Sequence, residues 1–164
     1  MRILELLLIS LIASSCRQTL PTQAVETVAL SGAFAGIVAS AKMQEVNSGQ
    51  TTTSLDVSVT MWNHASSSLQ FVVLANCPVY VRLSPADSTT SGPTYDESAH
   101  PCVRSGRQIN LAPGDSVVLV DTVPADSLRL LPRGSYHGVA TVTAGTNQPS
   151  VSAGTVTLPL TGVR

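Results

Sequence analysis

The chain has 164 residues, a formal net charge of -1 and only 12% charged residues. This length suits one domain of about 100–150 residues plus a leader. The near-zero charge and the single lysine, Lys42, exclude an electrostatic nucleic-acid binder. A hydrophobic content of 43% excludes wholesale disorder, and 4% aromatic residues leave few platforms for stacking bases or sugar rings.

The first fifteen residues predict a secretory leader, or signal peptide. Arg2 supplies a positive start, residues 3–13 form a short apolar run, and small residues follow at 13–15. The run is too short for a membrane span of about 20 residues. A buried N-terminal helix is the alternative, but small residues followed by a polar stretch favour a cleavage site.

Cys16 comes directly after these small residues. The segment ASSC resembles the bacterial lipobox, in which the cysteine becomes the lipidated first residue of the mature chain, although Ala13 stands where Leu is usual. The resemblance implies an exported lipoprotein, held to a bacterial membrane by lipidated Cys16 on the periplasmic side or at the cell surface. Plain export without a lipid is the alternative.

The two remaining cysteines, Cys77 and Cys102, form an even pair if Cys16 carries lipid. In an oxidising compartment such a pair predicts a disulfide, here closing a loop of about 25 residues. A metal site that also uses His100 is the alternative. Neither cysteine has a CxxC partner, and a closed zinc site needs four ligands, so we expect no metal and no cofactor.

The mature chain begins with residues 16–35, which we expect to form a tether. Pro21 and its polar neighbours discourage a helix there. Val25, Val28 and Leu30 leave open whether the end of the tether adds a first edge strand.

From residue 37 onward, apolar and polar residues alternate with the period of a strand. Leu55, Val57, Val59 and Met61 alternate with polar residues, so these four should face the core together. Strands are predicted at 37–44, 55–61, 69–76, 79–83, 107–111, 116–121, 136–143 and 154–160. Many short strands with regular turn residues between them predict an all-β domain over residues 36–164.

Two segments break this pattern. Residues 84–101 form a long polar stretch between the paired cysteines, and long irregular loops are usually functional or flexible. Tyr95 is its large aromatic residue, so Thr94, Tyr95 and Asp96 are the candidate contacts for a partner; a plain connector is the alternative. Residues 122–133 have Pro near both ends and an apolar middle, which leaves two readings open: a cap on one end of the domain, or a plain connection that helps to close the core.

No arrangement typical of an enzyme is present. The sequence lacks a nucleophile elbow, a metalloprotease helix, a phosphate-binding loop and a dinucleotide fingerprint. His64, His100 and His137 lie in different predicted elements, and most acidic residues sit beside Gly, Pro or Ser, where they serve turns. Trp62, at a strand end, is expected to pack at the core or its rim. We therefore expect a protein that is not an enzyme.

Four segments in chain order resemble a known family: LDVSVTMWNHASSSLQFVV, LAPGDSVVLV, LPRGSYHGVATV and VSAGTVTLPL. Their order is similar to that of the intracellular proteinase inhibitor (BsuPI) family, over about residues 54–160. The resemblance implies an immunoglobulin-like antiparallel β-sandwich of seven or eight strands. This chain departs from the family in its export leader and its cysteine pair, and no inhibitory residue is carried over.

Two local features fit such a sandwich on physical grounds. Tyr136 follows Gly134 at a strand start, so its ring could be buried while its hydroxyl bonds a nearby backbone group. Pro113 and Gly114 suit the two central positions of a type II turn.

These observations together favour a lipid-anchored, extracytoplasmic β-sandwich that acts as a non-catalytic binding or envelope-structural module. Its expected partners are a protein of the cell envelope and, through the anchor, the membrane. The alternative function is a protease inhibitor that presents the loop 84–101 to an enzyme.

Overall fold

The computed structural model describes residues 25–47, 53–87, 94–99, 102, 105–146 and 148–158. The predicted leader, Cys16 and His100 lie outside these residues. Within the described ranges, no helix is both long enough and apolar enough to cross a membrane.

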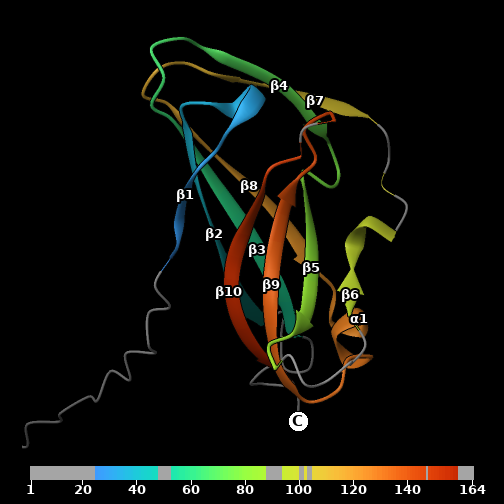
Figure 1. Cartoon of the computed structure of the whole chain (residues 1–164). Coiled ribbons are helices and arrows are strands. Elements are labelled where there is room, and N and C mark those ends of the chain that lie inside the picture. Colours follow the sequence, from blue (N-terminus) through green and yellow to red (C-terminus); the bar gives the residue numbers. More distant parts are fainter. Residues whose placement is uncertain are drawn as a thin grey trace, which may run out of the picture.

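The described strands form antiparallel sheets that pack as a sandwich (Figure 1). One sheet has the order β1-β2-β3-β8, from β1 (Thr27–Ala29), β2 (Ile37–Asn47), β3 (Thr53–Asn63) and β8 (Ser116–Val123). The facing sheet has the order β10-β9-β5-β6, from β10 (Ser150–Leu158), β9 (Gly134–Val142), β5 (Val79–Pro85) and β6 (Tyr95–Asp96). A two-stranded sheet joins β4 (Leu69–Leu74) to β7 (Gly106–Leu111) at one end.

This architecture confirms the predicted all-β, immunoglobulin-like sandwich. Eight of the described strands have six or more residues, in the order that the alternation predicts, and β1 and β6 are short additions. The core lies between the two sheets because alternation turns one face of each strand inward. The inward row of β3 is fully buried, which confirms that Leu55, Val57, Val59 and Met61 face the core together.

The sandwich starts earlier in the chain than the expected boundary at residue 36. Within the predicted tether, β1 pairs with β2, and the 3-10 helix η1 (Gly32–Phe34) follows it. Phe34 is 4% exposed and meets the ring of Phe71 edge to face at 5.4 Å between centroids. Phe34 follows Ser31, Gly32 and Ala33 and belongs to no alternating pattern, so only the packing assigns it to the core.

The predicted corner and turn are confirmed. The buried Tyr136 donates a hydrogen bond from its hydroxyl to the carbonyl oxygen of Pro132 at 3.0 Å. Gly114 has a φ of 82°, as the third residue of a type II turn requires, and Asp115 donates its N–H to the carbonyl of Ala112 at 3.0 Å.

The last strand begins at Ser150, earlier than the predicted start at residue 154. Its register with β9 shifts between Ser152 and Gly154, where a bulge interrupts the alternation. Gly154 has a φ of 86°, which explains why glycine occupies the bulge. Because the bulge interrupts the alternation of apolar and polar residues, the sequence pattern predicted only the second half of the strand.

Residues 122–133 cap one end of the sandwich, which was one of the two possibilities that the sequence left open. They complete β8 and then form the short helix α1 (Ala125–Arg129), whose Ala125 and Leu128 are buried. Figure 1 shows α1 at the end of the sandwich opposite β4 and β7.

Candidate functional site

Within the polar segment between β5 and β7, strand β6 pairs with the edge of β5 (Figure 1). Tyr95 pairs with Leu83 and Asp96 pairs with Arg82, which makes β6 an edge strand. Successive side chains of a strand point to opposite faces, so Tyr95 turns inward, with 8% of its surface exposed, and Asp96 turns outward. The sequence predicted an irregular loop with Tyr95 available to a partner. The structure places the Tyr95 ring in the core because strand pairing directs it there.

Asp96 also starts the following 3-10 helix, η2 (Glu97–Ala99). Its Oδ1 accepts hydrogen bonds from the N–H of Ser98 at 3.0 Å and from the hydroxyl of Ser98 at 2.6 Å. An aspartate that bonds the backbone two residues on is a common turn device. The alternation of Tyr95 inward and Asp96 outward continues through this turn, so the next side chain, Glu97, points inward.

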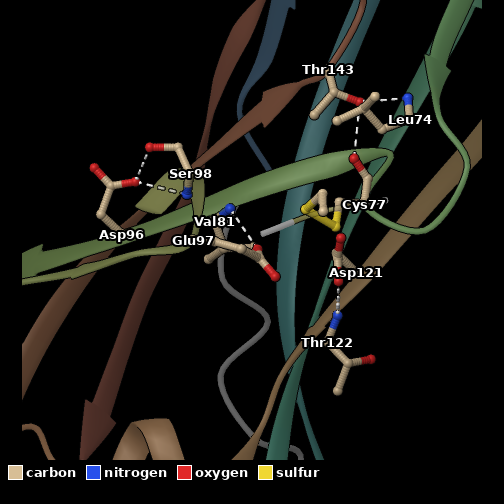
Figure 2. Close-up of a disulfide and its surroundings, with 10 residues drawn as sticks. Leu74, Cys77, Val81, Asp96, Glu97, Ser98, Asp121, Thr122 and Thr143 are labelled. Atoms are coloured by element: carbon tan, nitrogen blue, oxygen red, sulfur yellow. Dashed lines mark hydrogen bonds between the residues drawn. A yellow bond between two sulfur atoms is a disulfide. The ribbon is translucent and has the colours of Figure 1, made fainter. Parts of the chain in front are cut away.

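Glu97 is a buried carboxyl, 8% exposed, beside the edge of β5. The N–H of Val81 donates to its Oε2 at 2.9 Å (Figure 2). Only Arg82 and Leu83 of β5 pair with β6, and Val81 lies one residue beyond them. The Glu97 carboxylate therefore continues the pairing of β6 with a side-chain hydrogen bond.

Asp121 of β8 lies across from this carboxyl. It belongs to the inward row of the strand, between the buried Leu119 and Val123. Its Oδ1 accepts the N–H of Thr122 at 2.8 Å. Its Oδ2 is buried and has no hydrogen-bond partner among the described residues, which is costly for a charged oxygen.

A disulfide joins the far end of this segment to the start of β5. Cys77 and Cys102 are bonded, with their Cα atoms 6.1 Å apart, which confirms the predicted pair. Thr143 fixes the backbone next to the disulfide. Its hydroxyl donates a hydrogen bond to the carbonyl of Cys77 at 2.9 Å and accepts one from the N–H of Leu74 at 3.0 Å (Figure 2). Both sulfurs are consumed by the bond, so neither serves as a thiolate ligand for a metal.

Burial shifts the protonation of all three inward groups. Desolvation raises the pKa of Glu97 to about 7; the Asp121 carboxylate adds to the rise, and the Val81 N–H opposes it. Desolvation also raises the pKa of Asp121, against the donated N–H of Thr122. The pKa of the Tyr95 phenol is raised by burial and further by Glu97, Asp121 and Asp96. Two carboxyls that face each other away from water resist carrying two charges.

We call Tyr95, Glu97, Asp121 and the Cys77–Cys102 bond the acidic seam. It fastens residues 94–99 and Cys102 to β5 and the residues just before it, with a strand pair, a side-chain hydrogen bond and a covalent bond. The stability of the seam depends on pH. A proton on Glu97 or Asp121 removes the like-charge repulsion between the two carboxylates. Within the described ranges, no three His, Cys, Asp or Glu side chains are grouped as metal ligands.

The seam predicts a pH dependence of stability. The pKa of Glu97 is about 7 in the folded chain, against an ordinary value of 4.5, so the folded state binds more protons between these pH values. The free energy of unfolding should therefore fall as pH rises from 4.5 to 7, by on the order of 3 kcal/mol. Glu97→Gln should flatten this slope in urea unfolding measured across that range.

Asp126→Asn is the matched control for this experiment, because that carboxyl is exposed on α1. It should keep the parent's slope. A Glu97→Gln variant with the same slope as the parent would remove Glu97 from the explanation.

The structure brings together only part of what the sequence singled out. Cys77 and Cys102 meet, Thr94 is exposed, Asp96 is half-buried, and Cys16 lies outside the described residues. The histidines do not gather: His64 is exposed after β3, and His137 is half-buried in the outward row of β9. Trp62 is half-buried in the outward row of β3, at the rim.

The sequence singled out neither Glu97 nor Asp121 as a site residue. Asp121 had a usable signal, because alternation in the apolar run 117–123 puts it in the same row as Leu119 and Val123. Glu97 had none, since its inward direction comes from the turn at Asp96 and from the pairing of a two-residue strand.

No protein-family model matches the chain, and no curated protein does. Among solved structures, it is similar to a β-glucosidase from Erythrobacter marinus, at 14% identity and a TM-score of 0.38, over 70% of this chain and 15% of that one. It is also similar to a Bordetella pertussis protein assigned as ApaA, at 15% identity and a TM-score of 0.40, over 74% of this chain and 90% of that one. β-Glucosidase 3B from Thermotoga neapolitana matches at 14% identity and a TM-score of 0.38, over 73% of this chain and 16% of that one. The chain thus spans less than a fifth of the length of these β-glucosidases.

Proposed function

We propose that this chain is an exported lipoprotein whose sandwich serves as a non-catalytic binding or structural module of the bacterial cell envelope. The observation that carries the proposal is the Cys77–Cys102 bond. Disulfides persist in oxidising compartments, so the bond supports export. It also uses two of the three cysteines and leaves Cys16, at the end of the leader, for a lipid.

The proposed contact surface is the outward side of segment 94–99. Thr94 is exposed and Asp96 is half-buried there, while Tyr95 holds the segment from inside. The seam restricts the segment before any partner arrives, which lowers the ordering cost of binding. The surface is polar, so we expect a polar interface of modest affinity with an envelope protein.

The lipid anchor is tested by the intact mass of protein extracted from membranes. We expect the loss of residues 1–15 and the addition of acyl mass on Cys16. Cys16→Ser should release the chain into the soluble fraction, because the covalent lipid supplies most of the membrane affinity. A membrane-derived parent protein that starts elsewhere or carries no acyl mass would contradict the anchor.

The contact surface is tested by affinity capture from the native envelope. Thr94→Arg places a bulky charge on the proposed surface and should abolish capture of the partner. Gln70→Arg makes the same kind of change on exposed β4 and should leave capture intact. If both variants capture the same proteins as the parent, the contact surface is wrong; if the captured protein is a protease that the parent inhibits, the inhibitor alternative replaces the structural one.

A further inference from the structure

One end of the sandwich presents an apolar side chain on a firm support. Leu130, directly after α1, is 83% exposed, the largest value among the exposed large hydrophobic residues of the described chain. Leu128 is buried and holds α1 on the core. The N–H of Leu131 bonds the carbonyl of Leu128 at 3.2 Å, and the Tyr136 hydroxyl bonds the carbonyl of Pro132 at 3.0 Å. Leu130 is thus held outward by a braced turn.

Two cations flank this leucine. Arg129 and Arg133 are both exposed. Arg129 lies 3.4 Å from Asp126, but the two side chains are 51% and 94% exposed, so water competes for this contact. An arginine can lay its apolar stem along a hydrocarbon boundary while its guanidinium stays with polar groups. A leucine between two such arginines matches the boundary between acyl chains and anionic headgroups.

The direction of β1 decides which end of the sandwich faces the anchor. Ala29 pairs with Val38, near the start of β2, whereas Thr27 lies two residues closer to the end of β2. The start of β1 therefore points toward the end of the sandwich where β2 ends and β3 begins. The same end holds α1, which follows Val123, the β8 partner of the third residue of β3. Figure 1 shows α1 at this end of the sandwich, opposite β4 and β7.

Chain length is compatible with this orientation. Val25, where the described structure begins, lies nine positions after Cys16, and a chain of nine residues reaches at most about 30 Å. We propose that the α1 end rests on the anchoring membrane, with Leu130 at the acyl boundary and Arg129 and Arg133 on anionic headgroups. The proposal rests on the lipid anchor proposed above and adds to it a fixed orientation.

The test uses a tryptophan reporter on vesicles. In a Trp62→Phe background, Leu130→Trp places the only indole at the proposed contact, and Val72→Trp places it on exposed β4 at the opposite end. The mature chain is coupled through Cys16, its one free thiol, to a maleimide lipid in vesicles of brominated phosphatidylcholine and phosphatidylglycerol. This coupling anchors the protein whether or not cells acylate it.

We expect quenching and a blue shift of the indole at position 130, and neither at position 72. Adding Arg129→Gln and Arg133→Gln should lower the docked-to-undocked ratio about fivefold per arginine on these anionic vesicles. Equal emission at both positions would overturn the proposal, and so would a blue shift without vesicles that grows with protein concentration, which indicates contact between copies. If protein taken from cells carried no acyl mass on Cys16, the proposed lipid anchor would be wrong. That result would leave the orientation measured on the vesicles unaffected.

Discussion

Val57→Asp is expected to lower the free energy of unfolding by several kcal/mol, or to prevent folding. Val57 is fully buried in β3, between β2 and β8. An unpaired charge in an apolar interior is among the most destabilising changes a protein can carry. The register adds a second cost, because Val57 lies directly opposite Asp121 in β8. The new carboxylate would face an existing buried carboxyl, and like charges opposite each other weaken a sheet.

Ser58→Asp is the matched control, one residue along the same strand and on the outward face. Its register neighbours are Lys42 and Val120, and Lys42 offers an opposite charge. We expect a change within about 0.5 kcal/mol for this surface position. Thermal and urea unfolding measure both variants. Similar losses in the two would show that the inward and outward faces of β3 are assigned incorrectly.

Replacing both Cys77 and Cys102 with alanine is expected to destabilise the chain by about 3.5 kcal/mol in the chain-entropy model, for a loop of roughly 25 residues. The loss should have a local component as well. Without the bond, residues 94–99 keep only the β6 pairing and the Glu97–Val81 hydrogen bond, and both can fray at a sheet edge.

Hydrogen exchange at the Val81 N–H separates this local effect from the global one. We expect that N–H to lose more protection than the N–H groups of β3 do, because its partner belongs to the released segment. Reduction of the parent chain should reproduce the result without any substitution. If the Val81 N–H and the N–H groups of β3 lost protection equally, the disulfide would act on the unfolded state alone.

The all-β class could be predicted from the sequence because strand alternation is a local signal. In β3 every second side chain is apolar, and the buried row is the one that this alternation marks. The disulfide could be predicted by counting cysteines, and the Tyr136 corner from a Gly and a Tyr at a strand start. These inferences need only neighbouring residues or pair counting.

Phe34 and Tyr95 show where local signals stop. Each is an aromatic residue in a stretch with no clear period, and the sequence allowed a tether for one and a binding loop for the other. Both rings are buried in the structure, Phe34 against Phe71 and Tyr95 beneath the edge of β5. Their burial depends on partners that are distant in the chain, which no local pattern contains.

The sequence by itself determined the eight longer strands, the inward row of β3 and the cysteine pair, because alternation and pair counting need only local residues. Only the tertiary structure decided that the Glu97 and Asp121 carboxyls lie near each other in the acidic seam. It also decided that the start of β1 points toward the end of the sandwich that carries Leu130. Both facts depend on which strands become neighbours. Strand order arises from long-range packing, in which distant residues compete to bury the same apolar faces.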